Sequence, residues 1–447
     1  MLPILLFIFV ALVMLGIGWF AGRKQDDEGY NLYNRKLPTL GYLVSYAATF
    51  IGAGFFITGT AYAYRYGLGL VWFFLGMIFG VIIFGFFARH LKERTKDLGL
   101  HTLPDFFGWR FGTKAAKILT IITLLLLAGD ISIQLIGGGK LLQSLGIMDY
   151  SFSVAITVSV VAAYLIFSGF RAVIWTDYVL MSAIIILTAI LAFFSGKYFQ
   201  PTAEQLNLFT VPIGTSVGFF LFGLFGPFSG PQYYQRIFAS KSPEIAKKGT
   251  WLSSLAILLP GAGLFIIGMA AKKIFPNIDP DLAFLQIIQL GGQSIALVGS
   301  LVLWAALMSS VDTLTFAGSH IFNKDLMGKP LSRKNVGIGV IILLGFGLVI
   351  SFVLPSVTSV AFMFLAGGMA VAPSAFLQWF MKTLKQYTVI TSMISGIIAI
   401  FLYSIINGIG PNVVAISFLV SIITLFLVHF IGKLFNYQKI SRHEITP

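Results

Sequence analysis

Long runs of apolar residues, separated by short polar segments, make up most of the chain. A helix that crosses a bilayer needs about 20 predominantly apolar residues, because each residue adds only about 1.5 Å along the helix axis. Thirteen runs approach or exceed this length, and they lie near residues 3–21, 40–64, 69–88, 118–143, 152–168, 173–195, 214–228, 250–271, 295–322, 336–354, 358–381, 387–407 and 412–432. The pattern predicts an all-α integral membrane protein with about thirteen transmembrane helices.

Two of these runs are interrupted by helix-breaking residues. The second run contains Gly52, Ala53 and Gly54, and the seventh run ends in the sequence GPFSGP at 226–231. Glycine lowers helix propensity and proline removes a backbone donor, so both segments are expected to leave the helical conformation. A small-residue packing face is the alternative for the first segment, but a second break at a matching place favours two discontinuous helices.

Each interrupted run opens a block of five helices, at residues 38–195 and 214–381. Because five is odd, the two blocks enter the membrane in opposite directions, which is the arrangement of inverted-repeat transporters. Outside the blocks the pattern predicts an N-terminal accessory helix at 1–22, two C-terminal accessory helices at 385–435 and a cytoplasmic tail at 436–447. The first helix lacks a basic n-region and a small-residue cleavage site, so we expect it to be retained.

Composition limits the classes of function. The chain is 57% hydrophobic and 10% charged, whereas soluble domains carry about 25% charged residues. No polar segment is long enough for a soluble catalytic or nucleic-acid-binding domain. We therefore expect no enzyme activity, no organic cofactor and no nucleic-acid partner, and the expected partners are the lipid bilayer and a small solute. The oligomeric state stays open, and the sequence is compatible with a monomer.

The net charge of +14 reflects topology. Lysine and arginine gather in alternate loops, and the positive-inside rule makes those loops cytoplasmic. The prediction is a multi-pass protein of the plasma membrane with its N-terminus outside and its C-terminus inside. The absence of cysteine excludes disulfides and thiol chemistry, and the five scattered histidines argue against a histidine-based metal site.

A polar cluster interrupts the apolar segment 301–323. Ser309, Asp312 and Thr313 share one helix face, and Ser310 lies about 100° round the helix. A carboxylate at this depth costs at least a few kcal/mol unless it meets water or a partner. Oxygen ligands without cysteine or histidine suit a hard cation. The alternative is that these hydroxyls only bond back to the helix and join neighbouring helices.

Two further acids lie within apolar runs. Asp130 has Gln134 one turn away, and Asp177 follows a short inner loop that contains Arg171. Either acid could be structural, with Asp130 paired to Lys140 or to a neighbouring helix, and Asp177 solvated or paired to Arg171. Substrate contact is the alternative for Asp130, because an unpaired acid at this depth marks a functional site by default.

Several motifs together resemble those of the sodium/solute symporter family, which includes carriers of proline, sugars, sialic acid and pantothenate. They are HTLPDFF, GFRAVIWTD, GPQYYQR followed by KSPEIAKKG, and AALMSS, and they span roughly residues 20 to 385 in the family's order. The loop GPQYYQRIFA is most similar to the proline-carrier branch. The resemblance implies the LeuT-type fold of five plus five inverted helices, with one helix before and two after.

The resemblance also implies ligands for one or two sodium ions. The first site would use the backbone carbonyls of Ala48, Ile51 and Ala306 and the hydroxyls of Ser309 and Ser310. A further site, present in some members, would use Asp177, Ser309, Asp312 and Thr313. Asp312 departs from the family, where a hydroxyl residue is usual, so it would either strengthen sodium binding or carry a proton. Phe50 stands where many members have a polar residue, and no direct side-chain role is expected there.

The sequence therefore predicts a sodium-coupled secondary symporter for a small polar organic solute. Proton coupling through Asp130, Asp177 or Asp312 is one alternative. A membrane sensor that signals through a separate partner protein is another, and a channel is less favoured because paired broken helices suit a closed central site.

The predicted solute carries an ammonium or other cationic group. Asp130 falls where related carriers of anionic or neutral solutes tend to have basic or neutral residues, and a buried carboxylate needs a cationic partner. The hypothesis is an amino acid or another amine bound at Asp130 and Gln134. The other predicted substrate contacts are Gly52, Phe55, Phe225 and Phe228.

Overall fold

The computed structural model describes residues 2–23, 25–52, 54–146, 148–354 and 357–443. In these ranges the protein is all-α, and the only β-type pairing is an isolated bridge between Leu37 and Ser240. The α-helices are α1 (Leu2–Gly22), α2 (Asp27–Leu32), α3 (Thr39–Phe50), α4 (Gly59–Tyr66), α5 (Val71–Thr95), α6 (Leu103–Phe111), α7 (Thr113–Ser144), α8 (Tyr150–Gly196), α9 (Ala203–Leu206), α10 (Ile213–Ser229), α11 (Pro231–Ala239), α12 (Pro243–Ile274), α13 (Ala283–Leu290), α14 (Gln293–His320), α15 (Arg333–Val353), α16 (Val357–Leu377), α17 (Gln386–Asn407) and α18 (Asn412–His443). Short 3₁₀ or π segments are η1 (Tyr33–Arg35), η2 (Gly54–Thr58), η3 (Gly67–Leu70), η4 (Pro280–Leu282) and η5 (Ile321–Leu326).

The protein is a multi-pass membrane protein. Its described residues contain ten helices that are long and apolar enough to cross a membrane, or eleven when the bent pair α10–α11 is taken as one span. Helix α8 has 47 residues, more than twice the length that one crossing needs. It kinks at Gly169, whose φ of 62° favours glycine and where a Cβ would lie 2.5 Å from the carbonyl oxygen of Tyr30.

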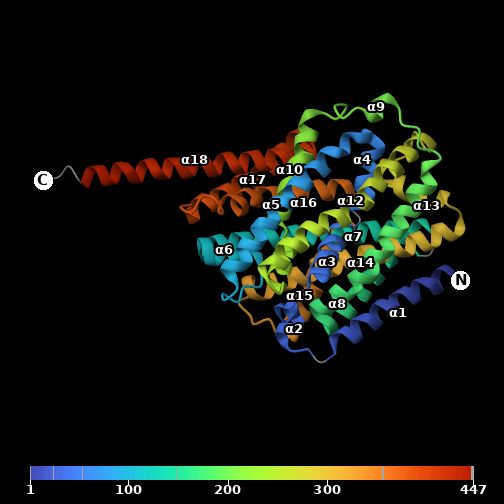
Figure 1. The fold of residues 1–447 in the computed structure, drawn as a ribbon, viewed down its shortest axis with the longest axis horizontal. Helices are drawn as coiled ribbons and strands as arrows, with labels where there is room; N and C mark the ends of the chain where they lie inside the picture. Colours follow the sequence, from blue (N-terminus) through green and yellow to red (C-terminus); the bar gives the residue numbers. More distant parts are fainter. Residues whose placement is uncertain (1, 24, 53, 147, 355–356, 444–447) are drawn as a thin grey trace.

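The last helix is longer than its apolar run. Residues up to 443 continue α18, although the apolar run ends near 432 and a tail was expected from 436. The segment 433–443 contains no glycine or proline to stop the helix. Figure 1 shows α18 extending beyond the other helices. Residues 444–447 lie outside the described ranges.

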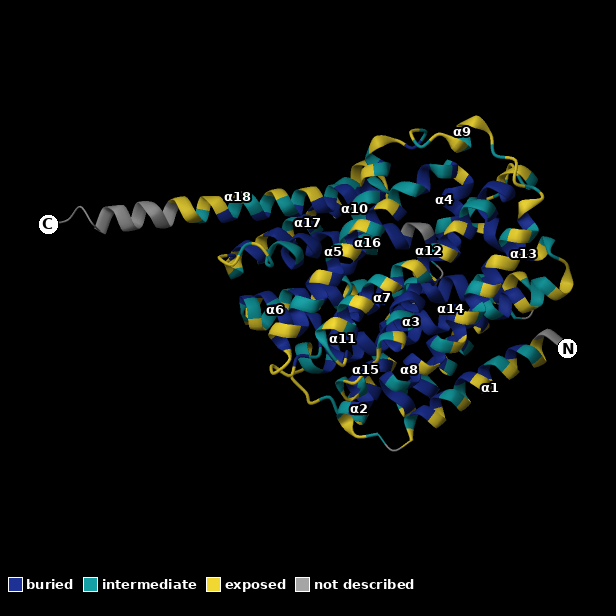
Figure 2. Ribbon diagram, viewed as in Figure 1, coloured by how far each residue is buried: buried dark blue, intermediate teal, exposed yellow. Residues whose placement is uncertain are grey.

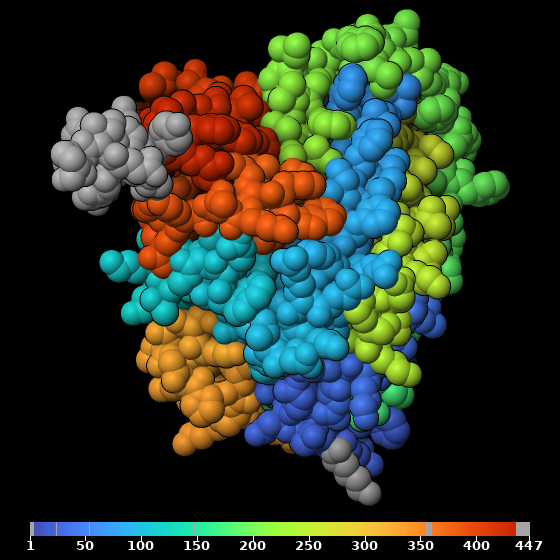
Figure 3. Space-filling model, turned by 60° about the vertical axis from the view of Figure 1, so that its left-hand side comes forward, coloured from blue at the N-terminus to red at the C-terminus, as the bar shows by residue number. Residues whose placement is uncertain are grey.

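The helices form a bundle whose most buried members lie at its centre (Figures 1 and 2). In α14, 67% of the most apolar window is buried, whereas the corresponding value for α1 is 28%. Helix α14 packs against α7, α8, α15 and α3. Helix α18 packs on the outside, against α10, α16 and α17 (Figure 3). The exposed large apolar side chains of α1 and α18 therefore suit contact with lipid.

Glycines let α5 and α10 approach backbone to backbone. A Cβ on Gly80 of α5 would lie 2.4 Å from the Leu224 carbonyl oxygen, and one on Gly223 of α10 would lie 2.3 Å from the Phe73 carbonyl oxygen. Gly76, four residues before Gly80, meets the Phe220 carbonyl in the same way. Small residues at this spacing are typical of close helix contacts in membranes.

This contact predicts that Gly80→Ala lowers the free energy of unfolding by about 1–3 kcal/mol, because the added methyl has no space beside a backbone carbonyl. The matched control is Gly345→Ala, where nothing lies within 4 Å of the added Cβ. Thermal denaturation of both variants in detergent measures the difference. Equal stability of the two variants would show that α5 and α10 can separate without loss.

Candidate functional site

The first break ends α3 at the middle of its span. The chain leaves the helix at Ile51, with φ −92° and ψ 77°, and resumes as the π-helical turn Gly54–Thr58. Among the described residues, no backbone N–H bonds to the carbonyl oxygen of Ala48 or Ile51. Both carbonyls are therefore available as ligands. Ala53 lies outside the described residues.

The second break separates α10 from α11. Pro227 lies inside α10 and Pro231 begins α11, and the two helices meet at an angle of 47°. The linking residue Gly230 is extended, with φ −84° and ψ 110°. Both predicted interruptions are thus present, and prolines without a donor account for the second one.

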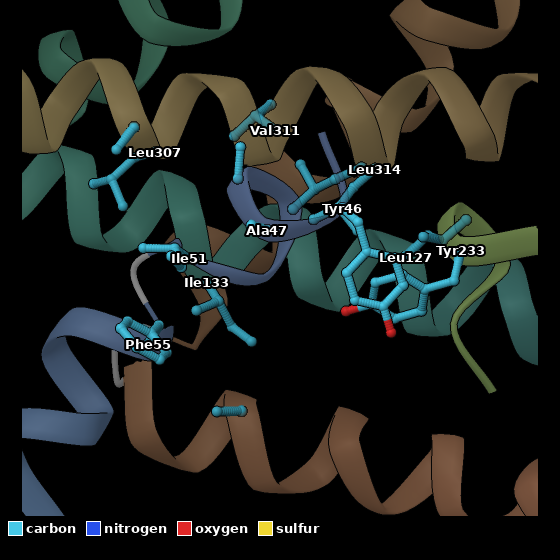
Figure 4. Close-up of a cluster of buried hydrophobic side chains, with 14 of the residues drawn as sticks. Tyr46, Ala47, Ile51, Phe55, Leu127, Ile133, Tyr233, Leu307, Val311 and Leu314 are labelled. Atoms are coloured by element: carbon cyan, nitrogen blue, oxygen red, sulfur yellow. The ribbon is translucent and has the colours of Figure 1, made fainter. Parts of the chain in front are cut away.

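The first break lies against α14 and α7. Figure 4 shows Ala47 and Ile51 at the end of α3 beside Leu307 and Val311 of α14 and Ile133 of α7. A Cβ on Gly52 would lie 2.7 Å from Ser310 Oγ and 2.4 Å from Gln134 Oε1. The unwound chain therefore lies close to both a hydroxyl of α14 and an amide of α7, and a larger residue at position 52 would displace these side chains.

The residues of the first expected sodium site lie on two elements, at the end of α3 and in α14. Ala48, Ile51, Ala306, Ser309 and Ser310 are all buried. Ser310 Oγ and the Ala306 carbonyl oxygen are 3.5 Å apart. Oxygens that share an octahedral cation at about 2.4 Å lie about 3.4 Å from each other. This spacing suits two adjacent ligands better than a strong hydrogen bond.

Asp177 lies next to Ser309 in the interior. It is fully buried, and Ser309 Oγ donates a hydrogen bond of 2.5 Å to Asp177 Oδ1. The hydroxyl proton of Ser309 is thereby directed to the carboxylate, which leaves the oxygen lone pairs free to face another group. Of the two structural alternatives, solvation does not apply to this buried side chain, and the guanidinium of Arg171 lies over the Tyr33 ring instead.

Asp312 lies one turn after Ser309 on the same face of α14 and has its own hydrogen-bond partner. Tyr164 Oη donates a hydrogen bond of 2.7 Å to Asp312 Oδ2. Asp312 Oδ1 is buried and has no hydrogen-bond partner among the described residues. A bare carboxylate oxygen in an apolar interior is costly, so this atom calls for a proton or a cation.

Arg236 follows an apolar run, so the positive-inside rule predicts that it lies in a cytoplasmic loop, and this prediction is wrong. Arg236 belongs to α11 and is fully buried. Its Nη2 donates to Ser45 Oγ at 2.6 Å and to Thr49 Oγ1 at 2.6 Å, and its Nε also donates to Ser45. The guanidinium therefore joins α11 to the last turns of α3, before the break.

Arg236 also reaches the acidic side of the site. Nη2 lies 4.0 Å from Asp177 Oδ2 and 3.2 Å from Thr313 Oγ1. Thr313, expected as a sodium ligand with Asp312, thus accepts from a guanidinium. The sequence does contain a signal for a buried Arg236, because a polar stretch follows directly on the second break. The positive-inside rule instead assigns such an arginine to a loop.

A cavity of about 220 Å³ lies beside the breaks. Four of the residues proposed as substrate contacts line it, namely Asp130, Gln134, Gly52 and Phe55. Asp130 is half-buried, and no ion pair joins it to Lys140 in the described part of the chain. The volume is below the range of about 300–1,000 Å³ of pockets for drug-sized ligands, so it suits a small solute.

The aromatic wall differs from the prediction. Phe225 and Phe228 do not line the cavity, because Phe225 stacks on Phe418 at 4.5 Å and Phe228 packs on Phe84 at 5.0 Å, fully buried. Phe50, for which no side-chain role was expected, does line it. The full set of lining rings is Phe50, Phe55, Tyr62, Phe73, Phe74, Phe219, Phe222, Tyr233, Phe362 and Phe364.

Residues 30–396 match the model of the sodium:solute symporter family. The chain belongs to this family. It is 27% identical to the high-affinity proline transporter PutP of Bacillus subtilis (strain 168), over 92% of this chain and 96% of that protein. It is 26% identical to a sodium/pantothenate symporter of Haemophilus influenzae, over 68% of each.

Solved structures agree on the fold. A Na⁺-coupled sialic acid symporter, in a substrate-bound outward-open state, superposes with a TM-score of 0.80 at 16% identity, covering 95% of this chain and 96% of that one. MHP1, a nucleobase-cation-symport-1 family transporter, gives a TM-score of 0.65 at 12% identity. The family members and structural neighbours are transporters and not enzymes, and the chain has their LeuT-like fold.

The buried cluster predicts that Arg236→Met lowers the free energy of unfolding by about 3–5 kcal/mol, because Asp177 then stays buried without its cation. The double variant Arg236→Met/Asp177→Asn should recover part of this loss, since the uncompensated charge is gone. Thermal denaturation of the three variants in detergent gives the comparison. An Arg236→Met protein as stable as the parent would show that the approach of Arg236 to Asp177 at 4.0 Å does not stabilise the fold.

Proposed function

We propose that the protein is a sodium-coupled secondary symporter that takes up a small organic solute by alternating access. The observation that carries this proposal is the meeting of the broken α3 with the buried hydroxyls of α14, directly beside the cavity. Family membership supports the same function. We place the protein in the plasma membrane with its N-terminus outside and its C-terminus in the cytoplasm, as the distribution of basic loops favours.

The proposed architecture is thirteen transmembrane helices in a five-plus-five inverted repeat. The first block, 38–195, takes the broken helix α3–α4, then α5, α7 and the two halves of α8 on either side of Gly169. The second block, 214–381, takes the broken pair α10–α11, then α12, α14, α15 and α16. Helix α1 precedes the blocks, and α17 and α18 follow them. Both blocks therefore open with a broken helix, which supports their being repeats.

Sodium would bind between the break and α14. The carbonyls of Ala48 and Ile51 belong to α3, whereas the Ala306 carbonyl and the hydroxyls of Ser309 and Ser310 belong to α14. An ion held by both elements stabilises only the conformations in which they are close together. Sodium would in this way select the state that presents a formed cavity to the solute.

Two contacts connect the ion to the rest of the site. Gly52 lies against both Ser310 and Gln134, so an ion that orders the break also orders the cavity wall. Asp177 acts as a positioning residue, because it accepts a hydrogen bond from the Ser309 hydroxyl and so turns the lone pairs of that oxygen toward the ion. The solute would bind at Asp130 and Gln134 through an ammonium group, and an amino acid or another amine meets this requirement.

The proton is a second candidate for a coupling ion, favoured by one specific observation. Asp312 Oδ1 is buried and finds no hydrogen-bond partner in the described ranges, while the guanidinium of Arg236 already donates to Thr313. A second sodium ion at Asp177, Ser309, Asp312 and Thr313 would have to share Thr313 with that guanidinium. A proton on Asp312 satisfies the bare oxygen without displacing Arg236. In that case one sodium ion is bound.

The first sodium site is tested by Ser309→Ala and Ser310→Ala in proteoliposomes with an imposed sodium gradient. Each loses one ligand oxygen, so the sodium concentration for half-maximal uptake should rise about tenfold, which corresponds to about 1.4 kcal/mol. Ser319→Ala on the same helix is the control, because that hydroxyl bonds only the Phe316 carbonyl. Unchanged sodium dependence in both site variants would remove the proposed site.

The second ion is tested by Asp177→Asn and Asp312→Asn. If the two acids share a sodium ion, either change should lower the sodium Hill coefficient from near two toward one. If Asp312 carries a proton, its variant should keep the sodium dependence of the parent and lose the dependence of uptake on pH. Uptake driven by a pH gradient without sodium would instead make the proton the sole coupling ion and contradict the sodium proposal.

A further inference from the structure

The lining of the cavity has a single charged side chain. Asp130 is the only acid among the described lining residues, and no lysine, arginine or histidine is among them. Arg236, which lies nearby in α11, does not line the cavity. Its guanidinium donates hydrogen bonds to Ser45, Thr49 and Thr313. The described wall therefore has one negative charge and no positive charge to balance it.

Aromatic side chains line the same cavity as this carboxylate. Ten of the described lining residues are phenylalanine or tyrosine. Phe364 packs directly on α7 at Gly129, the residue before the acid, since a Cβ on Gly129 would lie 2.1 Å from the Phe364 ring. Tyr62 packs on Phe219 at 4.7 Å and on Phe362 at 5.7 Å, which closes another side of the aromatic wall.

An aromatic enclosure with one carboxylate recognises a particular kind of ion. The faces of aromatic rings attract cations, and such enclosures bind quaternary ammonium groups, whose methyl groups also gain from apolar contact. A carboxylate adds the countercharge that a buried cation needs. A solute carboxylate, by contrast, would meet only neutral donors from groups such as Thr58 and Gln232, and would be repelled by Asp130.

We propose that the transported solute is a small monocation, a methylated ammonium compound without a carboxylate, and not a zwitterionic amino acid. This proposal rests on the proposed symport function and narrows its substrate. The onium group binds between the Asp130 carboxylate and the aromatic faces that include Phe364. The rest of the solute has to be small, because the cavity holds about 220 Å³.

The experiment compares four probes that differ by one chemical feature at a time. Choline is the cation, 3,3-dimethylbutan-1-ol is its uncharged carbon isostere, glycine betaine adds a carboxylate, and proline is the amino acid. Binding is measured by the thermal shift of the purified full-length protein with and without sodium, and uptake by labelled choline and proline in proteoliposomes. Choline is expected to bind at least tenfold more tightly than each of the other three probes.

Variants assign the effect to the carboxylate. Asp130→Asn should weaken choline binding at least tenfold and leave the weak binding of 3,3-dimethylbutan-1-ol unchanged, whereas Asp130→Glu should retain part of the choline affinity. Asp97→Asn, an exposed acid outside the cavity, is the matched control and should bind as the parent does. A merely structural Asp130 would lower stability without separating the charged probe from its isostere.

The outcomes separate this inference from the proposed function. Sodium-driven uptake of proline with choline binding no more tightly than proline overturns the inference and leaves symport intact. Choline binding that is selective, depends on Asp130 and is not accompanied by sodium-driven uptake supports the inference and overturns symport. Equal binding of choline and its isostere, or no binding of choline at all, overturns the inference directly.

Discussion

Charged and polar groups in the apolar interior of this protein have to be matched within the bundle, because lipid offers them no partner. Arg236 is one such group, and its contacts connect several helices. From α11 it donates to Ser45 and Thr49 of α3 and Thr313 of α14, and it lies 4.0 Å from Asp177 of α8. Four segments far apart in sequence are thereby held in one relative position next to the two breaks.

The same molecule combines rigid and interrupted contacts. Helices α5 and α10 meet through glycines with no space for a methyl group, so they are expected to move together. The break after α3 instead has bare carbonyls and touches its neighbours through Gly52. Its position depends on what fills the space beside it, and this makes the break a suitable place for an ion to influence the cavity.

The sequence allowed much of the fold to be predicted, since membrane helices are recognised by their length and hydropathy. Both breaks were found through glycine and proline, and four of the proposed substrate contacts, Asp130, Gln134, Gly52 and Phe55, line one cavity. Rotation of a helix about its axis was harder to infer. Phe225 and Phe228 lie on faces of α10 that pack on other helices, and no periodicity in a run this apolar distinguishes such faces from the cavity face.

Arg236 was missed because a basic residue after an apolar run normally marks a loop. Its burial has a consequence for the response to membrane voltage. Arg236, Asp130, Asp177 and Asp312 all lie in segments that span the membrane, and when ionised they sum to an excess of negative charge. Moving one elementary charge across the potential changes its energy by about 2.3 kcal/mol per 100 mV. An inside-negative potential would therefore drive the empty, negative site back outward, whereas the site loaded with one sodium ion and a monocationic solute carries no net charge and moves without a change in electrical energy.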